Sequence, residues 1–420
     1  MEVYLTSAPG VGGKLRFFPE DFVVEEMSLP PPKVVGGDYV ALRARMRNWE
    51  TNRLIRELSR SIGISRHRIQ FAGTKDKRGV KVQFFTILAS LEQVGRISLG
   101  DFEVLEAYTT DRPLELGNLM GNRFEIRLRG ALGEGLPQAL AAVTEGLASE
   151  GGFPNFFGIQ RFGALRPVTH VVGERMVRGD IEGAVMAYLG RPMEAESDEV
   201  RQARARLEKE MDFSAAVDYF PRHLSFERSL IHHLHLHPGD WAGALRQLPL
   251  NLLMMFVHAY QSVLFNRILS RRIRDGLPLR EPVTGDIVLP VDDKGRPDHD
   301  HYIQVEAHNL QRIQNKARAG KAFVSGVLFG SETSFAGGPM GEIERAVVEA
   351  EGLQPRDFII PDLPEVSSKG TRRELLVRFE PGEPQIVHEE GSVMFKFALP
   401  RGCYATALLR EYIKGEALDY

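Results

Sequence analysis

A carboxylate surrounded by cations occupies a short stretch in the first quarter of the chain. Asp76 has Lys75, Lys77 and Arg78 as neighbours within residues 71–79. Positive charge close to a carboxyl group favours its ionised form. An ionised carboxylate beside an anionic ligand can act as a nucleophile or as a general base. The alternative interpretation is a polar hairpin tip, in which the aspartate hydrogen-bonds only its own backbone.

Two strands are expected to position this stretch. Residues 68–71 alternate polar and apolar side chains, and residues 80–88 are rich in β-branched and aromatic types, which favours strands. Gly73 and Gly79 bracket the intervening turn, because glycine adopts backbone angles that a Cβ forbids. The sequence therefore predicts that Asp76 lies in a loop between two strands.

Five separated stretches resemble one enzyme family. Residues 73–77, Gly-Thr-Lys-Asp-Lys, are similar to the signature loop of the TruD family of tRNA pseudouridine synthases. Four further stretches resemble that family in the expected chain order: residues 19–26, 116–124, 154–163 and 399–411. The resemblance spans the whole chain and is weak between about residues 167 and 364.

The resemblance implies an α+β fold. It predicts a pseudouridine-synthase-type mixed, mostly antiparallel sheet with flanking helices, plus an inserted α/β second lobe, the TRUD domain. Residues 1–166 and 365–420 would then form a discontinuous catalytic domain, and residues 167–364 would form the inserted domain.

The resemblance also implies an activity and roles for individual residues. Enzymes of this family isomerise uridine 13 of tRNA by breaking the C1′–N1 bond and forming a C1′–C5 bond. Asp76 would supply the carboxylate, either attacking C1′ or removing the 2′-proton. The target base must leave its stack, and a flat side chain can recover part of that cost. By resemblance that side chain is Phe124, with Asn122 hydrogen-bonding nearby. Arg16 falls where the family often has a lysine that contacts a phosphate or the aspartate.

Composition restricts the class of protein. The chain has 420 residues, of which 43% are apolar and 26% charged, as in a soluble globular protein of about two domains. It lacks a continuous run of about 20 apolar residues, and its first residues lack the pattern of a secretory signal. We therefore predict no membrane association. The single cysteine, Cys403, fits a reducing cytoplasm and is predicted to pack rather than react.

The net charge of −3 conceals a basic region. Residues 43–81 contain twelve basic and three acidic residues, a net charge of +9 in a range that includes the Asp76 loop. Such a concentration attracts a polyanion, which for this chain would be RNA. Residues 52–62 are predicted to form a helix with Arg53, Arg56 and Arg60 on one face. The apolar side of this helix would be formed by Leu54, Ile55, Leu58 and Ile62. Asn48 or Thr51 would cap its N-terminus, and Gly63 would end it. The predicted RNA-binding residues are Arg16, Arg53, Arg56, Arg60, Lys75, Lys77 and Arg78.

Neither a metal nor a nucleotide cofactor is predicted. His233, His235 and His237 would share one face of a strand, as a set of metal ligands can. However, Pro and Gly end the run at residues 238–239, and no CxxC or HExxH pattern supports a metal site. The default interpretation is a polar strand here and a solvated loop at the second histidine cluster, residues 298–301. The glycine-rich residues 10–15 lack the spacing and the Ser/Thr of a phosphate loop.

Periodicity predicts the remaining elements. Strands are expected around residues 22–24, 39–42, 121–129, 375–379 and 393–399. The family resemblance implies that the last two rejoin the N-terminal half in one sheet. Helices are expected over residues 136–147, 201–211, 250–274 and 405–414.

Two other functions compete with the synthase. A catalytically idle RNA-binding module, such as a tRNA folding chaperone, would also need the basic region, but not Asp76 in particular. A histidine-liganded metal hydrolase would need bound metal.

Overall fold

The computed structural model of the chain describes residues 3–73, 78–115, 118–131, 135–379, 385–387 and 392–415. Contacts divide the chain into two compact units. The sheet unit comprises Tyr4–Phe153 and Arg378–Tyr420; the helical unit comprises Pro154–Val377 together with Met1–Val3. These limits lie about a dozen residues from the expected domain boundaries at 166/167 and 364/365, and the assignment of a catalytic and an inserted domain remains a prediction.

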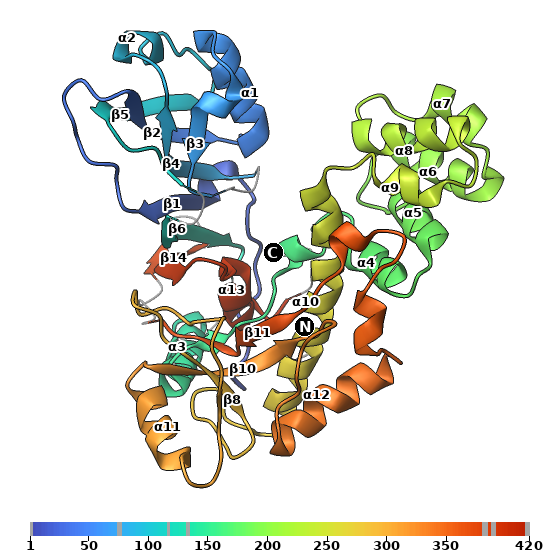
Figure 1. Cartoon of the computed structure of the whole chain (residues 1–420). Coiled ribbons are helices and arrows are strands. Elements are labelled where there is room, and N and C mark those ends of the chain that lie inside the picture. Colours follow the sequence, from blue (N-terminus) through green and yellow to red (C-terminus); the bar gives the residue numbers. More distant parts are fainter. Residues whose placement is uncertain are drawn as a thin grey trace. The chain divides into compact units, whose positions relative to one another are not determined.

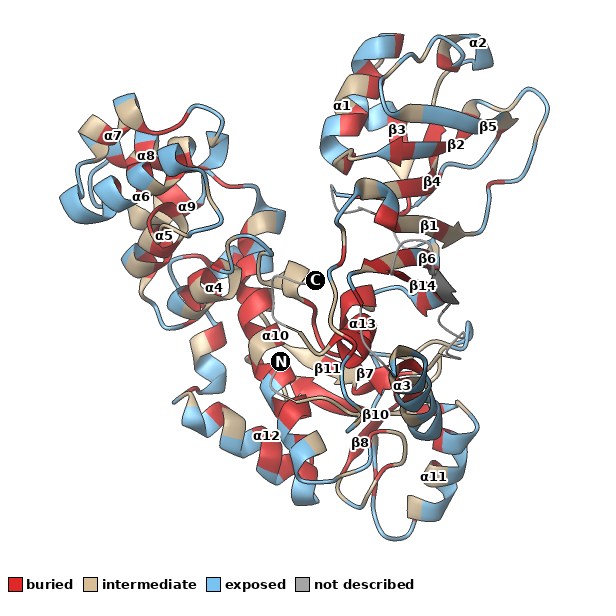
Figure 2. Ribbon diagram, turned by 180° about the vertical axis from the view of Figure 1, so that it is seen from behind, coloured by how far each residue is buried: buried red, intermediate tan, exposed pale blue. Residues whose placement is uncertain are grey.

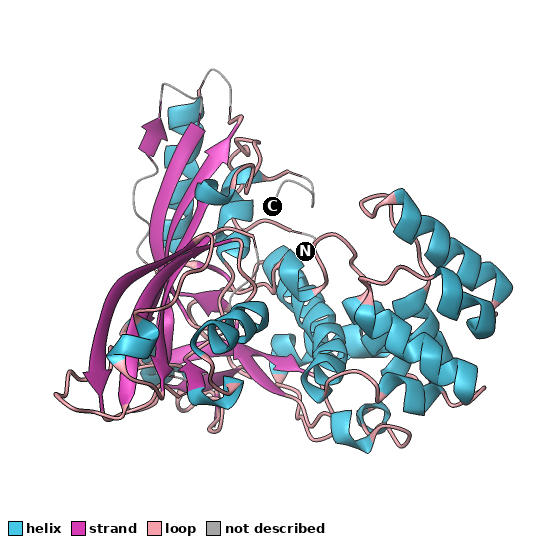
Figure 3. Cartoon of the chain, turned by 90° about the horizontal axis from the view of Figure 1, so that it is seen from above, coloured by secondary structure: helices cyan, strands magenta, loops and turns pink. Residues whose placement is uncertain are grey.

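Eight strands of the described residues form one twisted sheet in the sheet unit, in the order β13-β14-β6-β1-β4-β2-β5, with β3 paired to β4 (Figures 1 and 3). Among these strands β1 and β4 run parallel, and the other pairs are antiparallel. The sheet is thus mixed and mostly antiparallel, as predicted. The bounds are β1 Phe22–Ser28, β2 Tyr39–Arg47, β3 Ile69–Phe71, β4 Val80–Ile87, β5 Phe102–Thr110, β6 Leu119–Arg129, β13 Gln385–Val387 and β14 Ser392–Pro400.

Helices flank this sheet because each buries an apolar side. Helix α1 packs Leu54, Ile55, Leu58 and Ile62 into a core shared with β2, β3 and β4. Helix α13 is buried along its whole length and lies against β14, with the Tyr412 ring 4.9 Å from that of Phe395. The bounds are η1 Pro19–Asp21, α1 Thr51–Ile62, η2 Arg66–Arg68, α2 Leu91–Val94, α3 Leu136–Glu150 and α13 Ala405–Ile413.

The helical unit surrounds a long helix, α10 Leu250–Arg274 (Figures 1 and 2). Its other helices are α4 Thr169–Val177, α5 Ile181–Leu189, α6 Asp198–Glu210, α7 Phe213–Tyr219, α8 Ser225–Leu236, α9 Trp241–Leu245, α11 Leu310–Arg318 and α12 Gly338–Ala350; its 3-10 turns are η3 Ile159–Arg161, η4 Pro355–Phe358 and η5 Pro364–Val366. A second sheet has the order β11-β10-β8-β9, with bounds β8 Ile287–Pro290, β9 Ile303–Gln304, β10 Ala322–Leu328 and β11 Thr371–Glu374. Strands β7 Phe153–Pro154 and β12 Leu376–Val377 pair with each other.

Helix α10, Leu250–Arg274, is long and apolar enough by length and composition to cross a membrane. Two-thirds of its most apolar window (67%) is buried within the protein. Figure 2 shows buried residues along this helix. It therefore packs as the core helix of its unit.

Several local predictions are confirmed. The expected helices at 52–62, 136–147, 201–211, 250–274 and 405–414 correspond to α1, α3, α6, α10 and α13, and the expected strands at 121–129 and 393–399 to β6 and β14. Gly63 ends α1 in a left-handed conformation, with φ of 67°.

Three local predictions are wrong. The N-cap of α1 is Glu50, whose carboxylate accepts hydrogen bonds from the amides of Asn52 and Arg53, rather than Asn48 or Thr51. The first histidine cluster ends helix α8 and forms no strand, because Leu230, Ile231 and Leu234 supply a buried helical stripe. Residues 375–379 do not rejoin the large sheet, since β12 pairs with β7.

The register of β3 and β4 differs from that of a tight hairpin. Phe71 at the end of β3 pairs with Phe85, in the second half of β4. The first half of β4 pairs instead with β1 on one side and with β2 on the other. The chain after β3 therefore re-enters the sheet at Val80, beside the start of β1.

Candidate active site

Asp76, Lys75 and Lys77 lie outside the described residues, so the site is built from the segments that flank them. At the C-terminal flank, the Gly79 amide donates to Asn48 Oδ1 (3.2 Å), and the Asn48 amide donates to the Gly79 carbonyl (2.9 Å). A Cβ on Gly79, whose φ is 131°, would lie 2.7 Å from the Phe22 carbonyl oxygen. This position requires glycine because the start of β1 approaches it so closely.

Arg78 joins this flank to the segment before β1. Its Nη2 donates to the Phe17 carbonyl over a long 3.5 Å. In the same segment Arg16 has a positive φ of 56°, and its guanidinium lies over the Phe22 ring, 4.2 Å from the centroid. Two of the predicted RNA-binding residues, Arg16 and Arg78, are therefore held by neighbouring parts of one short segment.

A buried ion pair fixes that segment to the sheet. Asp21 is 2% exposed, and both of its carboxylate oxygens accept hydrogen bonds from Arg129 at the end of β6, at 2.8–3.0 Å. Asp21 Oδ2 also accepts from the Phe18 amide at 2.8 Å. The Arg129 backbone exchanges two hydrogen bonds with Lys14. Residues 14–21 are thus attached to β6 at both ends.

Phe124 lies in an aromatic cluster on β6. Its ring stacks on Phe397 of β14 (5.3 Å, 27°) and meets Phe22 edge to face (6.2 Å). It is 6% exposed. Asn122 is partly exposed and lies two residues earlier on the same strand, so it projects from the same face of the sheet.

Strand β1 brings this cluster to the chain that follows Asp76. Val24 pairs with Phe124 on one side, and Val23 pairs with Val80 on the other. Because neighbouring strands are about 4.8 Å apart, Val80 and Phe124 are separated by two strand spacings, or about 10 Å. The structure thus gathers Arg16, Arg78 and Phe124, with Asn122 alongside.

The arginines of α1 form a more distant group. Asn48, which contacts Gly79, lies two residues before Glu50, the N-cap of α1. Arg53 in the first turn of α1 is therefore nearer to Gly79 than Arg60 is, because Arg60 lies about 10 Å further along the helix axis. The Arg53 guanidinium lies 5.3 Å from the Trp49 ring centroid. Arg56 and Arg60 both contact Glu57, at 3.4 and 3.2 Å.

The charge count of residues 43–81 overstates the free positive charge. Arg43 pairs with Glu25, and Arg47 pairs with Glu20, carboxylates that lie outside this range. Lys81 is buried and donates to the Trp49 carbonyl. The basic surface is therefore concentrated on fewer residues than the sequence indicates.

The histidine clusters have ordinary polar partners. His233 Nε2 lies 2.9 Å from Asp240 Oδ2, and His235 Nδ1 lies 2.8 Å from Ser214 Oγ. The second cluster lies in a loop, as predicted, where His301 contacts Asp298 at 2.8 Å. Within the described ranges, no group of three or more His, Cys, Asp or Glu side chains is placed to hold a metal ion.

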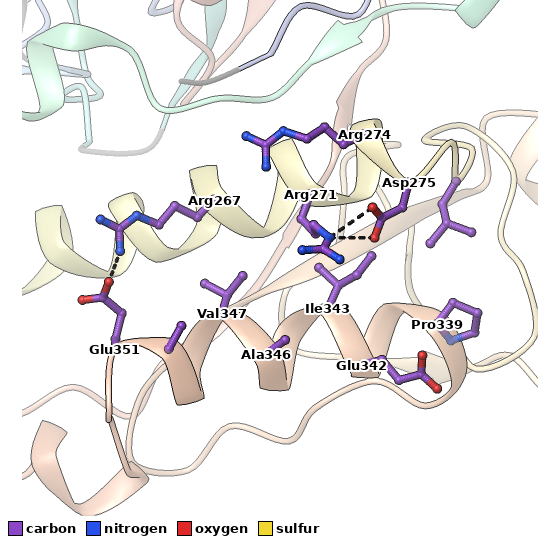
Figure 4. A pocket seen from close by; sticks show the side chains of 12 residues that line it. Arg267, Arg271, Arg274, Asp275, Pro339, Glu342, Ile343, Ala346, Val347 and Glu351 are labelled. Carbon is purple, nitrogen blue, oxygen red and sulfur yellow. Dashed lines mark hydrogen bonds and ion pairs between the residues drawn. The ribbon is translucent and has the colours of Figure 1, made fainter.

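Two cavities of the helical unit differ in charge. One, of about 490 Å³, lies between α10 and α12, and Figure 4 shows two of its three arginines bonded to carboxylates, Arg267 to Glu351 and Arg271 to Asp275. The other, of about 470 Å³, is lined by Arg161, Lys369 and Arg373, together with His258 and several hydroxyl groups. Its described lining residues include no carboxylate, although Lys369 contacts Glu332 at 3.1 Å. Burial, and after it the charge of Arg161, lowers the pKa of His258. The second cavity thus favours an anion.

Comparison with known proteins decides the family. The family model described as tRNA pseudouridine synthase D (TruD) matches residues 1–412. The chain belongs to the TruD family. A protein of Methanococcoides burtonii named probable tRNA pseudouridine synthase D is 42% identical over 100% of this chain and 97% of its own length. One of the same name from Thermococcus gammatolerans is 40% identical over 98% and 97%. A crystal structure of the Methanosarcina mazei TruD protein has a TM-score of 0.85 at 38% identity, covering 100% of this chain and 98% of the other.

The family and its fold are therefore as predicted from the five motifs. Within this TruD chain, residues 19–26 form η1 and most of β1, residues 118–124 lead into and begin β6, and residues 399–411 end β14 and begin α13, all in the sheet unit. Residues 154–163 open the helical unit. Sequence reasoning missed Asp21 and Arg129 as a pair, although Asp21 lies within the first motif.

We predict that tRNA binding depends steeply on salt and that α1 contributes to the dependence. Log affinity falls linearly with log salt, by about 0.7–0.9 for each phosphate neutralised. Reversing Arg53, Arg56 and Arg60 to Glu should weaken binding and flatten that slope, as measured by filter binding at several salt concentrations.

Arg96→Glu is the matched control, since Arg96 is exposed, pairs with Glu92 and lies outside the basic range. If the triple variant keeps both the affinity and the slope of the parent, the face of α1 does not touch RNA.

Proposed function

We propose that this TruD-family chain is a cytoplasmic tRNA pseudouridine synthase that isomerises uridine 13 of tRNA through the carboxylate of Asp76. The observation that carries the proposal is the family match across residues 1–412, which includes the Gly-Thr-Lys-Asp-Lys loop. The described flank of that loop supports it, because Arg78 and Arg16 lie close to the Phe22–Phe124–Phe397 cluster.

The proposed reaction rearranges one nucleoside without a net change of redox state. The C1′–N1 bond breaks, the freed uracil turns, and C5 bonds to C1′; the proton on C5 then leaves and N1 takes one up. Asp76 acts either by attacking C1′ or by removing the 2′-proton, and both routes need an ionised oxygen beside the ribose.

The surrounding residues hold the flipped nucleotide. Lys75, Lys77 and Arg78 are assigned to phosphates, and Arg16, held by its contact with Phe22, would contact a phosphate or Asp76. Phe124 is 6% exposed and contacts both Phe397 and Phe22, so the uracil would reach its ring only when one of these two side chains moves aside. Asn122, on the same side of β6, would hydrogen-bond the base or its ribose. The arginines of α1 would meet the RNA backbone further from the target.

The test of the function is to map pseudouridine in an unmodified tRNA transcript incubated with the purified protein. We expect one new pseudouridine, at position 13, and none when cytidine replaces that uridine. A protein that binds the transcript tightly but forms no pseudouridine would instead be the idle RNA-binding module.

We predict that Phe124→Leu folds and binds tRNA with near-parental affinity but turns over slowly at saturating protein. Leucine keeps most of the packing volume against Phe22 and Phe397 but lacks a flat face, and base stacking on such a face contributes roughly 1–3 kcal/mol. Rates should fall by a corresponding factor of roughly 5 to 150.

Phe124→Tyr, which keeps the ring, is the control and should retain most of the rate. Phe124→Ala is less informative, since emptying the cluster should cost about 3–5 kcal/mol of folding stability. A parental single-turnover rate in Phe124→Leu would assign the ring to core packing alone.

A further inference from the structure

Two adjacent phenylalanines are exposed beside the candidate site, and none of the proposed roles uses them. Phe17 is 58% exposed and Phe18 is 48% exposed. Their rings contact each other edge to face, with centroids 4.9 Å apart. Single exposed apolar side chains are common on protein surfaces, whereas two large rings in contact form a small contiguous apolar patch that a ligand can cover.

The structure fixes the backbone that carries these rings. The Phe18 amide donates to Asp21, which is itself bonded to Arg129, and the Arg129 guanidinium lies 5.0 Å from the Phe18 ring centroid. The Phe17 carbonyl accepts from Arg78. The backbone that presents both rings is therefore fixed before any ligand arrives, which lowers the entropy cost of binding.

The charge around the rings indicates the kind of ligand. Arg16, Arg78 and Arg129 lie in or contact this segment. Within residues 14–21 the two carboxylates pair with arginines, Asp21 with Arg129 and Glu20 with Arg47. Flat apolar faces among cations suit unpaired nucleobases joined by phosphates, as in proteins that bind single-stranded nucleic acid.

We propose that Phe17 and Phe18 form a platform on which an unpaired nucleobase of the tRNA, close to the flipped uridine, stacks. Arg78, which contacts Phe17, lies two residues after Asp76 in the chain, and this places the platform at the edge of the site. The proposal rests on the proposed function for its ligand. Every base has a π-face, so the platform would be tolerant of base identity.

The test compares two double variants, Phe17→Leu with Phe18→Leu and Phe17→Tyr with Phe18→Tyr. Leucine keeps apolar area without a flat face, whereas tyrosine keeps the ring. We expect the dissociation constant for unmodified tRNA to rise roughly 5- to 150-fold in the leucine variant and to stay near the parental value in the tyrosine variant. The salt slope should be unchanged in both, because no phosphate contact is lost.

Phe226→Leu is the matched control: it alters an exposed ring of the helical unit and should bind tRNA normally.

Parental affinity in the leucine variant would overturn the platform, and so would an equal loss in both double variants. A large drop in melting temperature of the leucine variant would assign the rings to folding. Loss of self-association with unchanged tRNA binding would make the patch an interface between copies. If the parent binds tRNA but forms no pseudouridine, the proposed function fails while the platform is still decided by the binding data.

Discussion

The buried ion pair between Asp21 and Arg129 is the constraint on which the candidate site depends. Asp21 is 2% exposed, and it accepts hydrogen bonds from both the guanidinium of Arg129 and the amide of Phe18. Removing one partner of a buried pair costs about 3–5 kcal/mol, because the remaining charge is left without compensation. The Arg129 side chain is one-quarter exposed, so the lower end of that range applies. Since the Arg129 backbone also bonds Lys14, residues 14–21 are held at both ends, and Arg16 is kept in its left-handed conformation between them.

After Asp21 the chain continues directly into β1, and the pairing of β1 determines which segments of the site are neighbours. It pairs in parallel with β4, which follows the Asp76 loop, and antiparallel with β6, which carries Phe124. Because β4 and β6 lie on the two sides of β1, Val80, which follows the Asp76 loop, and Phe124 are about 10 Å apart. The cations near them are few, because several arginines of the basic range pair with carboxylates. Specific binding would thus depend on a small number of well-placed cations and rings.

Much of this arrangement was predictable because the helices and strands follow from local patterns of apolar residues. The stripe of Leu54, Leu58 and Ile62 indicated α1, and the alternation of residues 121–129 indicated β6. The predictions that failed depended on contacts between residues distant in sequence, or on a choice between two local interactions. Asp21 and Arg129 are separated by 108 residues, and no short pattern reports such a pairing. Glu50 caps α1 although Asn48 was an equally good candidate, because Asn48 is engaged with Gly79. Alternation of the histidines suggested a strand, but buried leucines at helical spacing prevailed.

The central claim is that the carboxylate of Asp76 performs the chemistry, and one comparison tests it directly. Asn is nearly isosteric with Asp, so Asp76→Asn should fold and still bind tRNA, but it lacks the ionised oxygen. Tritium release from tRNA labelled at C5 of uridine, at saturating protein, separates chemistry from affinity. By the scale of nucleophile deletions in other enzymes, the account predicts a fall of roughly a thousandfold or more for Asp76→Asn, and a much smaller loss for Lys77→Ala, which removes only a neighbouring charge. Substantial single-turnover activity in Asp76→Asn would contradict the assignment, because another group would then carry out the reaction.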